Sequence, residues 1–301
     1  MAISIIDAAN LIRHGGLVAF PTETVYGLGA NAFDAAAVAK IFELKGRPSS
    51  SPLIVHVASI DMARKLAADW PDRAEELAQK YWPGPLTIVL EKAPEIPDIV
   101  TAGLPTAGLR MPDHPIALEL IEAAGVPIAA PSANRFTHLS PTTPEHVREE
   151  FGDAVEILEG GSSRVGIEST VVSLAGGSLT LLRPGQIWFE EIEQACAPEL
   201  AAHPSPGMHP RHYSPTTLLL LVNHPNELPD RHGAYMWRQE SGIASRSVRM
   251  PRDPASYANR LYSVLHELDR ERWPWIAVEL PPDRPDWAAI RDRLRRASGK
   301  R

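Results

Sequence analysis

The chain has 301 residues, which is long enough for two domains that each bury a hydrophobic core. Its 44% hydrophobic and 22% charged residues are typical of a globular protein in water. The balance of 30 basic against 37 acidic residues gives a formal net charge of -7, which argues against a general cationic surface for nucleic acid.

The cysteine count and the apolar runs exclude further classes. A single cysteine, Cys196, excludes an internal disulfide and a zinc site built from several cysteines. No apolar run is long enough to span a bilayer, and the N-terminus lacks the basic flank of a signal peptide. We therefore expect a cytoplasmic protein.

Strand-like and helix-like segments alternate through the first two-thirds of the chain. Short apolar runs predict strands at 17–20, 53–57, 86–90, 126–130, 170–174 and 179–182. Start signals predict helices that begin near Asp34, Asp61, Arg73, Asp113 and Thr143. This alternation predicts a mixed α/β domain.

A proline-rich segment separates this region from a second α/β pattern. Five prolines and three histidines lie between Pro198 and Pro215, without an amphipathic period, which favours an extended linker. Strands are then expected at 218–222 and 275–280, with a helical apolar stripe at 258–268 between them. The last helix ends in several arginines, a pattern typical of a solvated helix terminus.

Two short motifs carry polar groups at alternate positions. KGRP contains Lys45 and Arg47, and PSAN contains Ser132 and Asn134. In extended backbone, residues i and i+2 point to one face, so both motifs together could line a pocket for a polyphosphate. Solvated charges after a helix and a simple turn are the alternative interpretation of either motif alone.

The glycine-rich motifs do not support a common nucleotide-binding loop. GLGANA at 27–32 matches the GxGxxA form of the dinucleotide fingerprint, but PTETVY intervenes where a strand should run into the first glycine. The sequence contains no GxxxxGK[ST], so ATP would have to be held without a P-loop.

Arginine and histidine residues in unusual surroundings give further candidates. Arg110 lies inside an apolar strand and needs an anionic partner, and a substrate carboxylate suits its planar guanidinium. His56, taken alone, reads as a core histidine. The linker histidines His203, His209 and His212 have no cysteine or carboxylate cluster beside them, so we do not interpret them as a metal site.

Ordered motifs along the chain resemble one family. They are LVAFPTETVYGLGANAF, KGRP, PLIVHV, YWPGPLTIVL, GLRMPDHP, PSAN, VGIESTVVSL, LLRPG and SPGMHPRHYSP, in this order. The chain resembles the YrdC-type family, specifically its two-domain threonylcarbamoyl-AMP synthases. The resemblance implies an α/β fold, with a YrdC-like mixed twisted-sheet domain at 1–197, a proline-rich linker or lid at 198–217, and a smaller Rossmann-like α/β domain at 218–301.

The resemblance also implies a reaction. L-threonine, bicarbonate or CO2, and ATP would give threonylcarbamoyl-AMP and pyrophosphate. Mg²⁺ would be shared among the ATP phosphates, without a metal site of the protein's own. The product would pass to a separate tRNA threonylcarbamoyl-transferase complex, and direct tRNA binding stays open.

Site residues follow from the resemblance, position by position. Threonine would contact Thr24, His56, Arg110, Ala130 and Thr170. ATP would contact Arg47, Ser51, Thr106, Ser132, Ser140, Arg183 and Tyr213. The catalytic set would be Lys45, Arg47, Ser132 and Asn134, which stabilise charge rather than attack as nucleophiles.

Two other functions use the same kind of domain. One is an RNA-binding module without adenylate synthesis, which the acidic balance and the lack of interleaved aromatic and basic residues disfavour. The other is carbamoyl transfer in hydrogenase maturation, where chains carry cysteine-rich fingers, and the single cysteine here argues against it.

Overall fold

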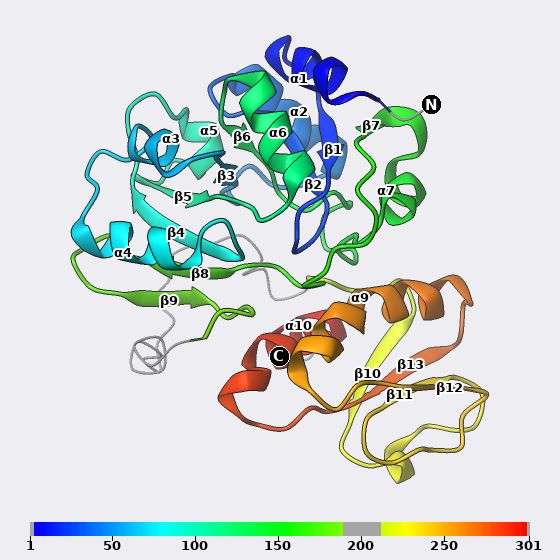
Figure 1. Cartoon of the computed structure of the whole chain (residues 1–301). Coiled ribbons are helices and arrows are strands. Elements are labelled where there is room, and N and C mark those ends of the chain that lie inside the picture. The colour runs from blue at the N-terminus through cyan, green and yellow to red at the C-terminus, as the bar shows by residue number, and fades with distance from the viewer. Residues whose placement is uncertain (1–2, 189–211, 300–301) are drawn as a thin grey trace.

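The computed structural model describes residues 3–188 and 212–299 (Figure 1). Most of the expected linker therefore lies outside the described residues, together with Cys196, His203 and His209. Within the described ranges, no helix has the length and apolarity that crossing a bilayer requires.

The first domain is built on one mixed sheet of nine strands. Its order is β7-β1-β2-β6-β3-β5-β4-β8-β9, and it combines antiparallel pairs such as β1/β2 with parallel pairs such as β3/β5. The strands are β1 (Val18–Phe20), β2 (Gly27–Asn31), β3 (Ile54–His56), β4 (Leu86–Glu91), β5 (Thr106–Arg110), β6 (Ile128–Ala129), β7 (Glu156–Ile157), β8 (Thr170–Ser173) and β9 (Thr180–Arg183). The predicted mixed-sheet domain is confirmed.

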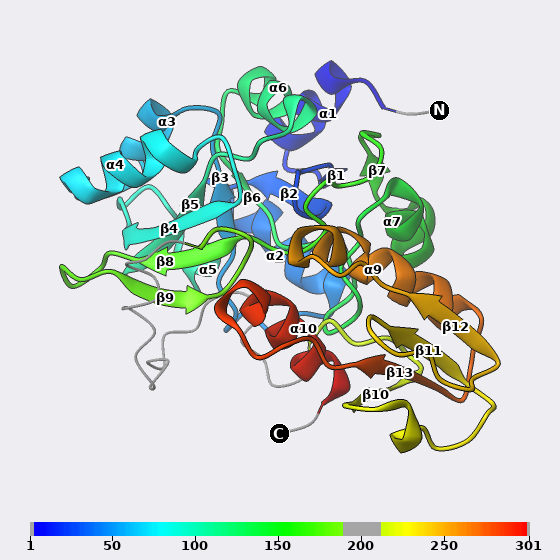
Figure 2. The same ribbon diagram turned by 60° about the horizontal axis from the view of Figure 1, so that its bottom comes forward.

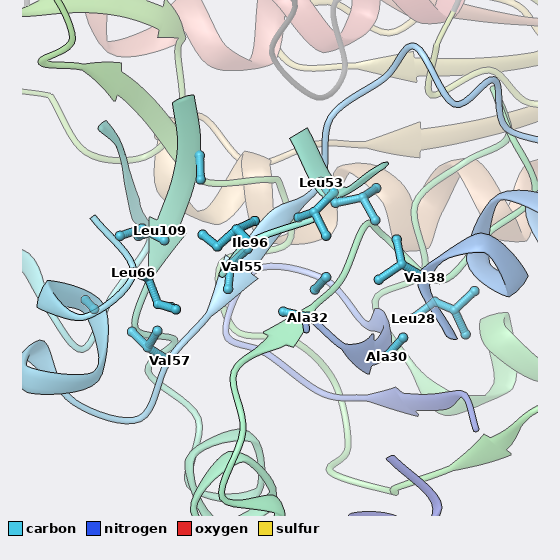
Figure 3. Packing of buried hydrophobic residues seen from close by; sticks show 14 of the residues in the cluster. Leu28, Ala30, Ala32, Val38, Leu53, Val55, Val57, Leu66, Ile96 and Leu109 are labelled. Atoms are coloured by element: carbon cyan, nitrogen blue, oxygen red, sulfur yellow. The ribbon is translucent and has the colours of Figure 1, made fainter. Parts of the chain in front are cut away.

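Helices cover both faces of this sheet. They are α1 (Ile5–Arg13), α2 (Ala35–Lys45), α3 (Ile60–Arg64), α4 (Asp72–Tyr81), α5 (Asp98–Thr101), α6 (Pro115–Ala124) and α7 (Pro144–Phe151), followed by a 3-10 turn at Gly152–Ala154. Helices α1 and α6 pack over Val18 and Phe20, whereas α2 packs on the opposite face (Figure 1). Figure 3 shows this second core, where Val38 of α2 lies beside Leu28 of β2.

The helix ends follow local chemistry that the sequence predicts. Asp34 caps α2 by accepting hydrogen bonds from the backbone N–H groups of Ala36 and Ala37. Thr143 caps α7 in the same way, and Pro144 occupies its first turn. Gly125 ends α6 with a left-handed backbone at φ 67°, which glycine adopts without strain.

The second domain has a four-stranded parallel sheet in the order β10-β13-β11-β12. Its elements are β10 (Leu218–Val222), a 3-10 turn at Pro225–Glu227, β11 (Ala234–Trp237), β12 (Arg246–Arg249), α9 (Pro254–Arg270), β13 (Trp275–Glu279), a 3-10 turn at Pro285–Trp287, and α10 (Ala288–Ser298). Both α9 and α10 lie on the side of this sheet that faces the first domain (Figures 1 and 2). The parallel α/β arrangement agrees with the predicted Rossmann-like domain.

The two domains share a hydrophobic core. Val25 and Ile167 of the first domain belong to the same buried cluster as Leu261 of α9. Asn259 adds hydrogen bonds to backbone carbonyls of the first domain. At Gly166, φ is +80° and an added Cβ would lie 2.6 Å from the Asn259 backbone, so only glycine permits this close approach. The second domain is therefore packed directly against the first domain rather than tethered to it.

Three local expectations are corrected by the structure. Lys45 and Arg47 do not lie on an extended segment, because Lys45 is the last residue of α2 and Gly46 turns the chain at φ 61°. The arginines of the last helix are not simply a solvated terminus either, since the Arg293 side chain is completely buried. The GLGANA run, for which no strand was predicted, forms β2.

Candidate active site

A pocket lies where several strand ends and loops of the first domain meet the described end of the expected linker, and its volume is about 520 Å³ when space open to solvent is included. Most of the residues expected at the site line it: Thr24, Arg47, His56, Arg110, Ala130, Ser132, Arg183 and Tyr213. Glu168 and His212 also line it, although the sequence did not single out Glu168. The pocket therefore collects residues from distant parts of the chain.

One end of the pocket is organised around a buried ion pair. Arg110, at the end of β5, lies 2.7 Å from Glu23, and both side chains are almost fully buried. The same guanidinium donates to Thr24 Oγ1 at 2.9 Å. From the sequence we expected a substrate carboxylate to be the partner of Arg110, but a carboxylate of the protein already pairs with it. A buried arginine requires an anion, and Glu23 is the one acid in the neighbouring PTETVY run.

His56 stands beside this ion pair. It is the register partner of Arg110 in the parallel β3/β5 pair, and its ring packs edge-on against Phe20 at 5.8 Å between centroids. Burial, with a smaller contribution from the neighbouring Arg110, lowers the pKa of His56 to about 3. The imidazole is therefore neutral at physiological pH, and its Nδ1 has no hydrogen-bond partner among the described residues.

Lys45 supports the pocket wall without lining the pocket itself. Its Nζ donates to the carbonyl of Ser132 at 2.6 Å and to the carbonyl of Asn134. Asn134 in turn donates from Nδ2 to the carbonyls of Arg135 and His138. Neither Lys45 nor Asn134 lines the pocket, whereas Ser132 does. These contacts hold the PSAN loop in place and direct Ser132 toward the cavity.

Burial dominates the electrostatics of Lys45. Its pKa lies well below the usual lysine value because of desolvation, and the nearby Arg47 acts in the same direction. Its two partners at the PSAN loop are carbonyl dipoles, which compensate a buried charge less well than a carboxylate does.

Arg47 contributes a cation to the pocket itself. The residue is 7% exposed, and its Nη2 donates to the carbonyl of Pro52 at 3.2 Å. Its Nε has no hydrogen-bond partner among the described residues, and no described carboxylate forms an ion pair with it. Burial lowers the pKa of Arg47 to about 10, so it stays charged at neutral pH. An anionic ligand would compensate this charge.

The remaining wall combines Arg183, Glu168, His212 and Tyr213. Arg183 donates from Nε to the Ser169 carbonyl at 3.1 Å and from Nη2 to the Ser169 hydroxyl at 3.0 Å. Tyr213 is 1% exposed with φ 61°, and its hydroxyl has no hydrogen-bond partner among the described residues. His212 packs against Tyr213 at 4.1 Å between ring centroids. The Tyr213 hydroxyl and His212 Nδ1 are thus the two buried polar atoms of this wall that have no hydrogen-bond partner among the described residues.

Four other expected residues do not line the pocket. The hydroxyl of Thr170 exchanges hydrogen bonds with the backbone of Ile187, at 2.9 and 3.0 Å. Ser140 donates to Glu168 at 2.6 Å, so it lies one contact behind the wall. Thr106 begins β5, at the opposite end from Arg110, and Ser51 lies in the loop before β3. Direct contacts of these residues with a substrate stay predictions.

Comparisons with known proteins identify the family of this chain. Residues 10–185 match the Sua5/YciO/YrdC family model, described as "Telomere recombination", and residues 187–299 match "Threonylcarbamoyl-AMP synthase, C-terminal domain". The threonylcarbamoyl-AMP synthase of Pyrococcus abyssi is 42% identical over 98% of this chain and 94% of its own length. The Bacillus subtilis enzyme of the same name is 41% identical over 99% of this chain and 93% of its length.

A solved structure matches over the same extent. Sua5 from P. abyssi, in complex with L-threonine, aligns with a TM-score of 0.89 at 40% identity, covering 98% of this chain and 94% of that one. The chain therefore belongs to the Sua5/YrdC family, and its full-length relatives place it among the adenylate-forming enzymes of that family. Within that family its function is that of a two-domain threonylcarbamoyl-AMP synthase, as the sequence predicts.

Proposed function

We propose that the pocket binds L-threonine at the Arg110 end and ATP at the Arg47 end, and joins them through a carbamate made from bicarbonate or CO2. The observation that carries this division is the different charge balance of the two ends. Arg110 is already paired with Glu23, whereas Arg47 has no carboxylate partner among the described residues.

The Arg110 end suits an amino acid. A zwitterion carries one positive and one negative group, so a site with one buried cation and one buried anion can match it without leaving net charge. Thr24 and His56 supply a hydroxyl and a neutral imidazole beside Arg110. The P. abyssi Sua5 structure in complex with L-threonine supports an amino-acid site in this fold.

The Arg47 end suits a polyphosphate. Arg47 and Arg183 provide charge, while Ser132 and Tyr213 provide neutral donors. The sequence has no P-loop, so these side chains would take the place of a backbone phosphate cradle. Tyr213 would contact the nucleotide from the end of the linker, as part of a lid that limits water around a hydrolysable mixed anhydride.

The reaction needs positioned charge rather than a protein nucleophile. The threonine amine adds to CO2 and loses a proton, which gives a carbamate anion. A carbamate oxygen then attacks the α-phosphorus of ATP, the bond to the bridging oxygen breaks, and pyrophosphate leaves. Arg47 would offset the repulsion between the two anions and stabilise the charge that develops on pyrophosphate.

Mg²⁺ would arrive with the ATP phosphates. Among the described residues, no group of three or more His, Cys, Asp or Glu side chains could hold a metal ion. Magnesium in nucleotide sites is often bound mainly by phosphates and water, so a dedicated protein cage is not required. The product, threonylcarbamoyl-AMP, would then pass to a separate transferase complex that modifies tRNA.

One assay tests the proposal. Purified protein is incubated with ATP and Mg²⁺, and pyrophosphate release is followed with and without L-threonine and bicarbonate. We expect release only when both are present, together with a product of the mass of threonylcarbamoyl-AMP. Replacing L-threonine by D-threonine is the matched control. Pyrophosphate release that does not depend on threonine would contradict the proposal.

A further inference from the structure

A buried polar cluster links the second domain to the pocket. Glu168, which lines the pocket, accepts hydrogen bonds from Arg293 Nε at 2.8 Å and from the Tyr262 hydroxyl at 3.1 Å. Arg293 belongs to α10 and Tyr262 to α9, so both donors come from the second domain. The first domain adds Ser140, whose hydroxyl donates to the other carboxylate oxygen at 2.6 Å.

Arg293 is the centre of this cluster. Its side chain is completely buried, and it also donates to the carbonyl of Pro184 at 2.9 Å and pairs with Asp292 at 2.8 Å. Its guanidinium lies over the ring of Tyr213, 5.3 Å from the ring centroid. One arginine of the second domain therefore touches a pocket carboxylate and supports a pocket tyrosine.

The negative charge of Glu168 would weaken the binding of a polyanion in this pocket. A carboxylate on the pocket wall repels phosphates and attracts the pocket cations. Among the cations that line the pocket, Arg183 is the one that interacts electrostatically with Glu168. Burial by itself would raise the pKa of Glu168, but Arg293 and Arg183 outweigh it and hold the pKa below the usual value. Glu168 is therefore ionised, and Arg293 is its direct ion-pair partner.

We infer that Arg293 is a positioning residue for the nucleotide: it neutralises Glu168 from the second domain, so that this carboxylate does not repel the phosphates, and it keeps Tyr213 in place. This inference rests on the proposed assignment of ATP to the Arg47 end. It gives the second domain a direct part in nucleotide binding, through side chains that are distant from Arg47 in the sequence.

The test compares ATP binding with threonine use. In Arg293→Met, we expect the Kd for ATP, measured by calorimetry, to rise by at least about tenfold. The KM for threonine should stay within about twofold of the unchanged chain. The matched control is Arg291→Met on the same helix, because Arg291 pairs with Asp283 and donates to the Pro281 carbonyl, both within the second domain. Its Kd for ATP should not change.

A double variant separates charge balance from simple structural support. Glu168→Gln removes the charge that Arg293 neutralises but keeps the side-chain shape. If the inference is right, Arg293→Met combined with Glu168→Gln binds ATP more tightly than Arg293→Met alone. A double variant that binds ATP no better than the single one, or a single variant that raises the requirements for both substrates equally, would overturn it.

A conservative variant keeps the test decisive if the methionine variant fails to fold. Arg293→Lys retains the charge but loses the planar guanidinium that donates to both Glu168 and Pro184. We therefore expect the Kd for ATP to rise by about threefold or more, without a matching rise in the KM for threonine. Unchanged ATP affinity in Arg293→Lys would count against the inference. If the unchanged chain shows no threonine-dependent pyrophosphate release, the proposed function fails, whereas normal release with unaltered ATP binding in the variants removes only the role of Arg293.

Discussion

The two ends of the pocket are built in different ways. The Arg110 end consists of first-domain residues, and its charges cancel in the Glu23–Arg110 pair. The Arg47 end gathers segments that are far apart in sequence, and Glu168, the one carboxylate among its described lining residues, is neutralised from the second domain. The first end is complete within one domain, and the second end depends on how the two domains meet.

This difference matches the ligands that we propose. A zwitterionic amino acid requires a balanced site, whereas a nucleotide triphosphate requires a cationic excess that must be protected from nearby carboxylates. Substitutions at the two ends should therefore affect the two substrates separately. Four predictions test this separation, in order of decreasing effect.

The largest effect is expected at the Arg110 end. Arg110→Met would leave Glu23 as a buried, unpaired carboxylate, which should lower the free energy of unfolding by about 3–5 kcal/mol. The KM for threonine should rise far more than the KM for ATP, because the lost cation faces the proposed amino-acid site. Urea denaturation and steady-state kinetics with each substrate varied in turn measure both effects.

A double replacement separates stability from binding at this end. Arg110→Met with Glu23→Gln removes both charges, so most of the lost stability should return, since a buried pair can often be replaced without net cost. Threonine use should stay impaired. Equal changes in the KM values for both substrates would mean that Arg110 serves the fold alone.

At the other end, Arg47→Ala should reduce the turnover of pyrophosphate formation by about 10²–10³-fold, the usual loss when one donor to a developing anion is removed. Its melting temperature should change little, because among the described residues Arg47 makes one backbone hydrogen bond and its Nε has no partner. Arg135→Ala, at an exposed arginine near the PSAN motif, is the control. Near-normal turnover of Arg47→Ala would remove Arg47 from the mechanism.

Local signals in the sequence predicted much of this structure. Asp34, Thr143 and Gly125 mark helix ends through hydrogen bonds and backbone angles that depend on near neighbours. Strand β2 was missed because its glycine-rich sequence lacks the β-branched residues that indicate a strand, and tertiary pairing with β1 and β6 stabilises it.

The candidate site was predictable only in part, for a related reason. Residue types and family motifs identified Arg47, Arg110 and Tyr213, and the structure brings them into one pocket. The pairing of Glu168 with Arg293 joins residues more than a hundred positions apart, and no local pattern encodes it. Their burial follows from how the domains pack, and therefore appears only in three dimensions.

Lys45 should behave differently from its neighbour Arg47. Lys45→Met would leave the carbonyls of Ser132 and Asn134 without their donor, which should cost about 2–3 kcal/mol of unfolding free energy. The control is Lys40→Met on the same helix, where an exposed lysine donates to the single carbonyl of Gly15.

Activity in Lys45→Met should fall less than in Arg47→Ala, because the effect reaches the substrate through a displaced Ser132. The stability loss and the activity loss should appear together, and both should be absent in Lys40→Met. A stable Lys45→Met protein with abolished turnover would instead indicate that the lysine acts directly on the substrate.

The smallest effect concerns the domain contact that the Arg47 end depends on. His146 of α7 and His266 of α9 stack across this contact, with 3.8 Å between ring centroids. Burial lowers the pKa of His146 to about 3 and that of His266 to about 4. The charged groups around them are Glu150, Asp269 and Arg270. Both rings are therefore neutral in the folded protein at physiological pH.

The direction of the pH effect follows from these values. An unfolded histidine titrates near pH 6.5, so between about pH 6.5 and pH 4 the unfolded chain binds protons that the folded chain does not. The unfolding free energy should be fully present above pH 6.5 and fall on acidification, by at most about 1.4 kcal/mol per pH unit for each histidine. His266→Gln should make this pH dependence shallower by about one proton, as measured by urea denaturation from pH 7 to pH 4.5. ATP affinity should also weaken with acid before threonine affinity does, because the domain contact supports only the Arg47 end. A pH dependence that is unchanged in His266→Gln, or that weakens both substrates together, would show that the stacked histidines do not control this contact.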